Sequence, residues 1–352
     1  MMNKYEEIYK KKSLPWGREK FYQSFKALGL VGERNTEDRI EKYKLKYLLE
    51  KNMSVLDIGS NCGFLDLYIS EHVKDVEGVE VEEHLVELSN LAKDELKFNN
   101  ATFYNEDFKK FKTDKRYDLI LSLAEHAWMH CGFKDYIKSI KKLLVGDGLL
   151  LIESHKINIG IDTEFKERLI EIEELGFTKL YESKIDEGRD ERIFAIFRLG
   201  KFERVKIKDI IEVGEVKYYR RLDLGVTYAT IEELIGGSNS CALYRRYHLL
   251  RHGWTNMNKN LITLKKYVDI VSKGLGDLLK PIKLDSQNGL FDGCHRLTSA
   301  IYCKQEYILV KKLDIIAATI VDSYALLKKG ASYEDVNIMQ EKAIEIVRSY
   351  NE

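Results

Sequence analysis

Residues 54–66 read Ser54-Val-Leu-Asp-Ile-Gly-Ser-Asn-Cys-Gly-Phe-Leu-Asp66, and this stretch decides the fold class. The apolar run 55–58 predicts a short buried strand, and the segment 64–72 has the spacing of a helix. A strand, a glycine-rich turn and a helix start together place backbone N–H groups at the carboxyl edge of a parallel sheet, where nucleotide-like ligands bind. Gly59 and Gly63 leave room for such a ligand, because neither has a Cβ. We therefore predict an α/β fold with a ligand-binding loop between these two glycines.

The spacing of this loop separates it from two other nucleotide-binding loops. From Asp57 it reads Asp-x-Gly-x-x-x-Gly, whereas the dinucleotide fingerprint is Gly-x-Gly-x-x-Gly. No Gly-Lys-Ser/Thr follows, which excludes a Walker-type phosphate loop. An acid that binds ribose hydroxyls is expected about 20 residues further on. Glu80 stands there, in the strand-like run 76–81. The alternative is an ordinary α/β turn that binds no ligand.

The loop resembles that of the class I S-adenosylmethionine-dependent methyltransferases, in which it holds the amino-acid part of the cofactor. The resemblance covers residues 40–199 and implies a Rossmann-like sheet of seven strands. In that family an acid after the third strand bonds the adenine amine and the next residue packs against the ring, positions that Asp107 and Phe108 match. The cofactor-binding residues so implied are Asp57, Gly59, Ser60, Asn61, Gly63, Phe64, Glu80, Asp107, Phe108 and Ser122.

The elements around the loop are those such a sheet needs. After the helix 82–97, further strands are predicted at 101–105, 117–122 and 149–153, helices at 133–144 and 165–175, and a closing antiparallel pair at 177–185 and 192–197. Residues 1–40 are predicted to form an N-terminal helical lid. Trp16, Arg18 and Arg39 are its candidates for substrate contact, although packing of the lid is the favoured explanation of Trp16.

His126 and Glu125 follow the predicted fourth strand, where a methyl acceptor would lie. Methyl transfer needs an aligned acceptor and, for a neutral hydroxyl or amine, a base that removes a proton. We therefore expect these two residues to be catalytic or to contact the acceptor. A phosphate or carboxylate acceptor needs no base, and His126 would then only position it. His130 has the i, i+4 spacing of a metal pair with His126, but no third ligand is placed nearby, so no metal site is predicted.

A second informative stretch, Phe291-Asp-Gly-Cys-His-Arg296, lies where a predicted strand enters a helix. His295 and Arg296 would lie beside the free N–H groups of the helix start, an arrangement that suits phosphate. We therefore predict that Gly293, Cys294, His295 and Arg296 bind a nucleotide or phosphate. The alternative is that His295 and Arg296 only cap and brace the junction.

This second stretch resembles the ParB/sulfiredoxin fold over residues 205–313, a smaller α+β domain. The sulfiredoxin signature has a nucleophilic cysteine where Cys294 stands, but glycine where this chain has Asp292. The Asp-Gly-x-His-Arg form is that of ParB-like members, which include nucleotide hydrolases and a small-molecule kinase. For a kinase, Asp292 is the nearest carboxylate for a catalytic or metal role, with ATP or ADP and Mg²⁺ as cofactors. Arg220, Arg245 and Arg246 could complete the positive charge.

Composition bounds the remaining possibilities. The chain has 352 residues, a formal net charge of zero and five cysteines without CxxC or zinc spacing. We therefore expect a cytoplasmic protein with reduced thiols, no membrane span and no bulk charge for coating nucleic acid. The predicted domains are a lid at 1–40, a methyltransferase domain at 41–199, a nucleotide-binding domain at 200–313 and C-terminal helices at 314–352.

The leading hypothesis is a bifunctional methyltransferase whose second domain is a kinase. It would O-methylate a sugar, a phosphorylated small molecule or a glycan. Its organisation is similar to that of the methyltransferase–kinase chain terminators of bacterial surface polysaccharide, which phosphorylate a terminal sugar and methylate the phosphate. One alternative is a tRNA- or DNA-modifying methyltransferase whose second domain recognises nucleic acid. Another is a methyltransferase gated by a non-catalytic nucleotide sensor.

Overall fold

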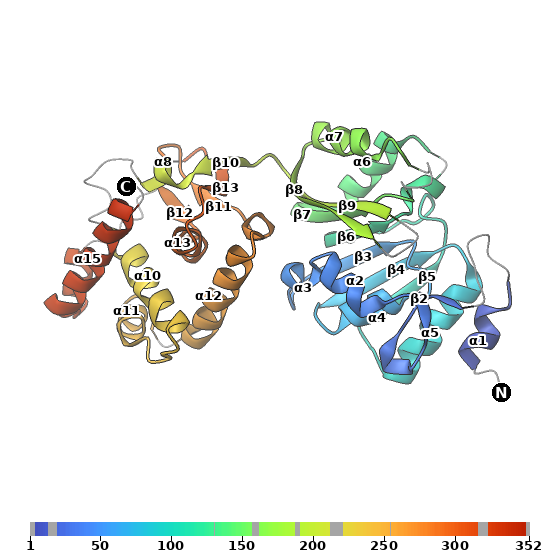
Figure 1. The fold of residues 1–352 in the computed structure, drawn as a ribbon, viewed down its shortest axis with the longest axis horizontal. Helices are drawn as coiled ribbons and strands as arrows, with labels where there is room; N and C mark the ends of the chain where they lie inside the picture. The colour runs from blue at the N-terminus through green and yellow to red at the C-terminus, as the bar shows by residue number, and fades with distance from the viewer. Residues whose placement is uncertain are drawn as a thin grey trace. The chain divides into compact units, whose positions relative to one another are not determined.

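The computed structural model describes residues 4–12, 20–129, 131–156, 162–186, 191–211, 221–253, 255–315 and 323–349. They fall into two compact units, Met1–Lys201 and Phe202–Glu352, shown in Figure 1. None of the helices in these ranges combines the length and apolar character that crossing a membrane requires.

Unit 1 is built on a seven-stranded sheet with the order β5-β4-β3-β6-β7-β9-β8. The strands from β5 to β7 are parallel, and β9 runs antiparallel to both β7 and β8. The mostly parallel, Rossmann-like sheet of seven strands that the sequence predicts is therefore confirmed. Its strands are β3 (Ser54–Ile58), β4 (Asp75–Glu80), β5 (Ala101–Asn105), β6 (Tyr117–Leu123), β7 (Leu144–Glu153), β8 (Phe177–Asp186) and β9 (Glu191–Leu199).

Helices cover both faces of this sheet, as Figure 1 shows. The helices of unit 1 that follow strands are α4 (Phe64–Ser70), α5 (Glu83–Leu96), α6 (Phe133–Leu143) and α7 (Phe165–Glu174). Every residue of β3 is buried, because a central parallel strand packs on both faces. Ile137, Ile140 and Leu169 carry the apolar faces of α6 and α7 into the core. The carboxyl edge of the sheet is thereby held rigidly under the loops that follow β3, β4 and β6.

The N-terminal segment differs from the expected helical lid. It contains α1 (Lys4–Tyr9), β1 (Phe21–Gln23), η1 (Lys26–Leu28), β2 (Gly32–Arg34), α2 (Thr36–Lys42) and α3 (Leu45–Leu48). Strands β1 and β2 pair in parallel, so part of the segment is a small sheet. A Cβ on Gly32 would lie 2.2 Å from the backbone carbon of Gln23, and only glycine allows so close a pairing. Asn35 begins α2 by accepting a hydrogen bond from the Asp38 N–H at 2.7 Å.

Unit 2 combines a four-stranded sheet of order β10-β13-β11-β12 with a group of helices. Its elements are β10 (Glu203–Lys206), α8 (Ile207–Ile211), α10 (Leu222–Ile235), α11 (Ala242–His252), α12 (Met257–Ser272), η3 (Gly276–Leu278), β11 (Ile282–Leu284), β12 (Leu290–Asp292), α13 (Cys294–Tyr302), β13 (Tyr307–Lys312), α14 (Ser323–Lys328) and α15 (Tyr333–Ser349). Strand β11 is parallel to β13 and antiparallel to β12. Helix α10 packs along α15 and α13, and its buried side chains enter two cores. The ParB/sulfiredoxin resemblance of this unit stays a prediction.

The close packing of α10 on α15 depends on Gly225. A Cβ there would lie 2.0 Å from the carbonyl oxygen of Met339 and 3.0 Å from the backbone N of Ala343. Backbone atoms of a packed helix have no rotamer with which to move aside, so Gly225→Ala is expected to destabilise unit 2 by about 3 kcal/mol. Helix propensity alone would predict the opposite sign, a gain of about 1 kcal/mol. Urea unfolding of the full chain measures the change.

Gly276→Ala is the matched control in the same unit. The nearest atom to a Cβ at Gly276 is Cγ2 of Val271 at 3.7 Å, an ordinary van der Waals contact. This variant is expected to unfold within about 0.5 kcal/mol of the wild type. Equal stability of the two variants would contradict the proposed role of Gly225.

Candidate functional site

The loop between β3 and α4 has a backbone shape that its sequence dictates. Gly59, Asn61 and Gly63 have φ values of 76°, 53° and 66°, in the left-handed region. A Cβ on Gly59 would lie 2.3 Å from the Glu125 carboxylate, and one on Gly63 would lie 2.6 Å from the Phe103 ring. The glycines therefore let the chain turn and let other groups approach the loop closely.

Glu80 ties this loop to the end of β4. Its carboxylate accepts hydrogen bonds from the backbone N–H of Asn61 at 2.9 Å and of Glu82 at 3.0 Å. The N–H groups of Gly59 and Ser60 donate to the Val79 carbonyl, which precedes Glu80 on the same strand. The predicted ribose-binding acid thus lies beside the glycine loop, on the neighbouring parallel strand. Burial raises the pKa of this carboxyl.

Several carboxyl groups converge on the loop. Burial raises the pKa of Asp57 to about 7. Burial, followed by the negative charges of Glu80, Asp57 and Asp107, raises the pKa of Glu125 well above its usual range. Asp66, in the first turn of α4, lies against Asp57, and burial together with that neighbour raises its pKa as well. The structure therefore brings four predicted residues, Asp57, Glu80, Asp107 and Glu125, into one acidic site suited to a positively charged ligand.

Other predicted cofactor residues make contacts inside unit 1. The Phe64 ring is fully buried and stacks on Phe25 of the N-terminal segment, with ring centroids 5.2 Å apart. Phe108 packs edge-on against Tyr136, whose hydroxyl lies 2.8 Å from the Ser122 Oγ. Asp107 accepts a hydrogen bond from the Lys109 N–H at 2.9 Å. Ser60 Oγ is buried and has no hydrogen-bond partner in the described part of the chain, so it is available to a ligand.

His126 forms a buried pair with a residue that sequence reasoning missed. Its Nε2 lies 2.8 Å from Asp162 Oδ2, and the other oxygen of Asp162 accepts from Arg168 Nη1 at 2.9 Å. Burial opposes ionisation of Asp162, yet the hydrogen bond with His126 holds its pKa below its ordinary value. His126 Nδ1 is buried and has no partner among the described side chains and backbone groups. No local pattern links two residues 36 positions apart; only the return of the chain after β7 brings them together.

Arg39, a predicted substrate contact, lies in a buried group that we call the arginine cluster: Arg34, Arg39 and Arg192 around Glu153. Glu153 ends β7 and accepts hydrogen bonds from Tyr43 OH at 2.6 Å, Arg34 Nη2 at 3.2 Å and Arg192 Nη1 at 3.2 Å. Burial opposes ionisation of Glu153, but the neighbouring guanidinium groups lower its pKa to about 2. Sequence reasoning singled out Arg39 alone.

In unit 2 the predicted phosphate-binding residues line one pocket of about 340 Å³. Gly293 has a φ of 109°, and α13 begins at the next residue, Cys294. A Cβ on Gly293 would lie 2.6 Å from the Ile282 side chain, so glycine allows the close approach of β11. The pocket is lined by Arg221, Asp223, Arg251, Tyr267, Leu290, Phe291, Asp292, Gly293, Cys294, His295 and Arg296.

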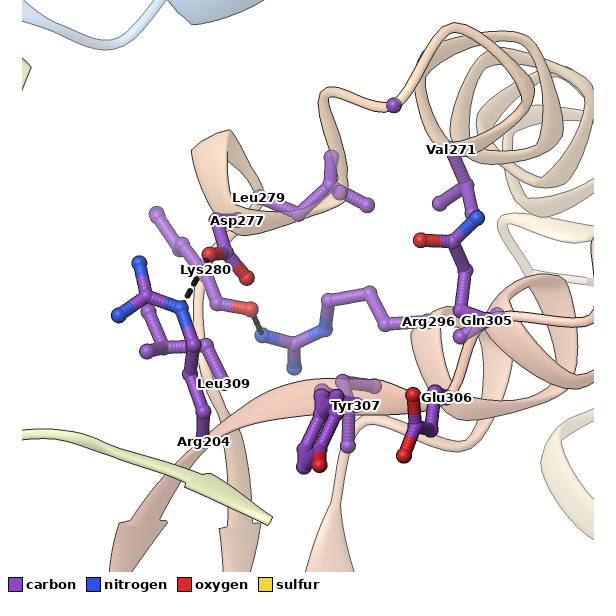
Figure 2. Close-up of a pocket in the computed structure, with 14 residues that line it drawn as sticks. Arg204, Val271, Asp277, Leu279, Lys280, Arg296, Gln305, Glu306, Tyr307 and Leu309 are labelled. Carbon is purple, nitrogen blue, oxygen red and sulfur yellow. Dashed lines mark hydrogen bonds and ion pairs between the residues drawn. The ribbon is translucent and has the colours of Figure 1, made fainter. Parts of the chain in front are cut away.

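The Arg296 guanidinium, however, is engaged with the protein. Nη1 donates to the carbonyl oxygens of Lys280 at 2.6 Å and Pro281 at 2.8 Å, and Nη2 lies 3.1 Å from Asp292 Oδ2. Figure 2 shows this side chain reaching into a second pocket, of about 270 Å³, toward Lys280. Arg296 therefore braces the junction between β12 and α13, which is the alternative that the sequence left open.

The two residues before Arg296 are uncharged near neutral pH. Burial, followed by the charge of Asp223, raises the pKa of Cys294 to about 12, so the thiol keeps its proton. Burial lowers the pKa of His295 to about 4, and its Nε2 lies 3.2 Å from Tyr244 OH. His295 can thus contribute a hydrogen bond but not a positive charge, and Cys294 does not have the character of a nucleophile.

The further arginine candidates have other partners. Arg246 forms a two-point pair with Asp335, and Arg245 bonds Ser240 and Asn258; neither is among the described residues that line the pocket. Trp16, Arg18, His130 and Arg220 lie outside the described residues. Within the described ranges no three His, Cys, Asp or Glu side chains are placed to hold a metal ion.

Comparisons with known proteins bear on unit 1. Residues 49–197 match a family model described as a methyltransferase domain, which supports a methyltransferase, and hence a transferase, in this unit. None of the curated proteins matches the chain.

Solved structures similar to this chain include the N-methyltransferase NodS from Bradyrhizobium japonicum WM9 in complex with S-adenosyl-L-homocysteine. It is 15% identical, with a TM-score of 0.43, covering 56% of this chain and 98% of that one. A SAM-dependent methyltransferase from Aquifex aeolicus is 18% identical, with a TM-score of 0.39, covering 45% of this chain and 88% of that one. Another SAM-dependent methyltransferase, from Thiobacillus denitrificans in complex with S-adenosyl-L-homocysteine, is 14% identical, with a TM-score of 0.39, covering 46% of this chain and 91% of that one. At these scores the likenesses carry no argument about substrate or mechanism.

Proposed function

We propose that unit 1 is a class I methyltransferase that uses S-adenosylmethionine. The observation that carries the proposal is the acidic site around the glycine loop, where Asp57, Glu80, Asp107 and Glu125 surround backbone that only glycine allows. A cofactor with a sulfonium and an ammonium group fits this site, because its positive charges offset the mutual repulsion of the carboxylates. When bound, it supplies a methyl group on an activated sulfonium carbon.

Within this proposal the site residues have distinct roles. Asp57 and Glu125 face the positive charges, Glu80 the ribose hydroxyls and Asp107 the adenine amine. The Ser60 hydroxyl, which is buried without a partner among the described residues, supplies a further polar contact. The remaining loop residues Gly59, Asn61, Gly63 and Phe64 contribute backbone groups, and Phe108 and Ser122 support the adenine side of the site.

His126 is proposed to act on the methyl acceptor. Asp162 accepts a hydrogen bond at Nε2 and so favours the tautomer with the proton on that nitrogen. Nδ1 is then left as the proton acceptor for a hydroxyl or amine. For an acceptor that is already anionic, the same hydrogen-bonded ring holds the acceptor in place without taking a proton.

For unit 2 we propose binding of a phosphate-bearing ligand in the pocket at the start of α13. Arg251 and the first N–H groups of α13 support this proposal, together with Arg221, which a two-point pair with Asp223 holds at the pocket. Phosphoryl transfer from ATP or ADP with Mg²⁺ would rest on Asp292, whose side chain is 51% exposed and paired with Arg296. A sensor that only binds nucleotide would need no such carboxylate. A sugar, glycan or phosphorylated small molecule remains our proposed acceptor, with tRNA or DNA as the alternative.

Calorimetric titration of the full chain tests both sites separately. S-adenosylmethionine is titrated first, then ATP and ADP with magnesium, into the wild type, Asp57→Ala and Arg251→Ala. Independent sites predict that Asp57→Ala loses only the methyl donor and that Arg251→Ala weakens only the nucleotide. Failure of the wild type to bind S-adenosylmethionine would overturn the proposed function, whereas failure to bind nucleotide would leave unit 2 as a module for another ligand.

S-adenosylmethionine affinity is expected to rise with pH. Asp57 has a pKa of about 7 without ligand, and a bound cation favours its ionised form, so binding below that pH must release a proton. Affinity should increase by up to about tenfold per pH unit below about pH 7 and level off above it. Calorimetry at about pH 6.5 in two buffers of different ionisation enthalpy measures the released proton directly. Asp57→Asn should make the affinity for S-adenosylmethionine nearly independent of pH. A wild-type affinity that falls as pH rises would contradict the prediction.

A further inference from the structure

We infer that the arginine cluster of unit 1 binds an acidic group, a carboxylate or a phosphate, on the methyl acceptor. This inference rests on the proposed function and adds the chemical class of the substrate. It is carried by two features of the cluster: an excess of buried positive charge, and buried N–H groups that have no acceptor among the described residues.

The charge excess follows from the members of the cluster. Arg34, Arg39 and Arg192 are only 6%, 2% and 3% exposed, and Glu153 is fully buried among them. The carboxylate of Glu153 is divided between two of the arginines, Oε1 accepting from Arg34 and Oε2 from Arg192. Arg39 has no described hydrogen bond to it. Among the described residues, three guanidinium groups thus surround one carboxylate, and buried charges are normally paired.

The unpaired donors lie on the same arginines. Arg39 Nη2 donates to Tyr43 OH at 3.2 Å, but its Nε and Nη1 have no partner in the described part of the chain. Arg192 Nε is likewise buried without a partner there. Buried donors of a cation are costly to leave unsatisfied. Guanidinium N–H groups match the two oxygens of a carboxylate or phosphate, which makes an oxyanion the fitting ligand.

Asp57 and Asp66 are the other acidic groups near Arg39. Both feel its positive charge, but neither forms a described hydrogen bond with it. Raised pKa values in this pair mean that it carries less than its full negative charge near neutral pH. The competing explanation is that Arg39 only offsets this pair through space, and the experiment below separates the two.

The position of the cluster fits an acceptor site. Glu153 is paired with Leu123 in the register of β7 and β6, and its carbonyl accepts a hydrogen bond from the Ala124 N–H at 3.1 Å. Glu125 and His126 follow directly. An acid group held by the arginines would therefore place the acceptor at the same carboxyl edge of the sheet as the glycine loop and His126. The donor atoms are covered from solvent, so entry requires the covering residues to move.

Thermal unfolding of the full chain in added sodium phosphate, and separately in sodium acetate at matched ionic strength, tests the inference. Wild type, Arg39→Gln, Glu153→Gln and the exposed control Arg116→Gln are compared. A bound anion raises the melting temperature by mass action. The wild type and Arg116→Gln should bind the anion equally, and Arg39→Gln should bind at least about tenfold more weakly through loss of charge-assisted hydrogen bonds. Because unit 2 is unchanged throughout, differences among these variants report on unit 1.

Glu153→Gln makes the test decisive, because it removes the competing carboxylate and should tighten anion binding by about tenfold. If Glu153→Gln cannot be purified in a folded state, Arg192→Gln is used in its place. Arg192→Gln is expected to weaken anion binding, as Arg39→Gln does. If the stabilisation that is lost in Arg39→Gln is larger with phosphate than with acetate, the acceptor is phosphorylated; the reverse indicates a carboxylate. The inference is overturned if neither anion stabilises the wild type or if Arg39→Gln leaves binding unchanged. S-adenosylmethionine titration in parallel separates that failure from failure of the proposed function.

Discussion

Asp57→Asn is expected to weaken S-adenosylmethionine binding by about 100-fold, through loss of a charge-assisted contact with the cofactor, while making the unliganded protein more stable. Wild-type Asp57 is 2% exposed, and this burial makes ionising it in the folded protein unfavourable. Asparagine keeps the shape of the side chain and removes the ionisable group. If one variant both loses affinity and gains stability, Asp57 is a residue that serves ligand binding at the expense of the stability of the fold.

The sign of the stability change follows from the pKa. The pKa of Asp57 is raised from its ordinary value of 3.8 to about 7, so between those values the folded state holds a proton that the unfolded state has lost. This group therefore lowers stability progressively as pH rises toward 7, and Asp57→Asn removes the loss. We expect a gain of roughly 4 kcal/mol at about pH 8 and little gain at about pH 4. Urea unfolding at the two pH values measures it.

Asp66→Asn is the matched control, because it removes the other half of the same buried pair. It should stabilise the unliganded protein in the same way, yet retain S-adenosylmethionine binding, since Asp66 lies in α4 and not in the loop. The hydrogen bond with Asp66 favours the ionised form of Asp57, and the asparagine amide can donate the same hydrogen bond, so affinity at neutral pH should stay near that of the wild type. Equal loss of binding in both variants would show that the pair acts through the fold.

Glu153→Gln is expected to have the largest effect on the stability of unit 1. Wild-type Glu153 is fully buried, and its pKa is lowered from 4.5 to about 2 by guanidinium groups that outweigh the effect of burial. A shift of that size corresponds to roughly 3 kcal/mol of stability. Removing the carboxylate also leaves the buried arginines unpaired, which has cost about 3–5 kcal/mol in other proteins. Urea unfolding near neutral pH measures the loss.

Glu182→Gln provides the control, since Glu182 pairs with Lys179 on the surface of the same sheet at 2.8 Å. It should change stability by less than about 0.5 kcal/mol. The stability that Glu153 confers is present above its ordinary pKa and is lost as pH falls through its lowered pKa, from about pH 4.5 toward about pH 2. If Glu153→Gln were as stable to urea as Glu182→Gln, the role assigned to the arginine cluster would be refuted.

The parallel sheet and the glycine loop could be predicted from the sequence alone. Burial along β3, the strand–turn–helix order around 54–66 and the need for glycine at positions 59 and 63 are local properties, set by a short apolar run, chain reversal and the missing Cβ. The same holds for the junction at Gly293 and Cys294, where a strand meets a helix within three residues. Local features of this kind can be recognised in the sequence without knowing which residues they contact in the fold.

The tertiary structure alone decided which side chains meet and how far they are shielded from water. Asp162 joins His126, Glu153 joins Arg34 and Arg192, and Arg296 turns to the carbonyls of Lys280 and Pro281. The small β1–β2 sheet depends likewise on the contact of Gly32 with Gln23. These pairings join residues up to 119 positions apart, and their charges and proton affinities depend on burial, which no local pattern records. For that reason the loop is encoded in the sequence, while the arginine cluster exists only in the folded chain.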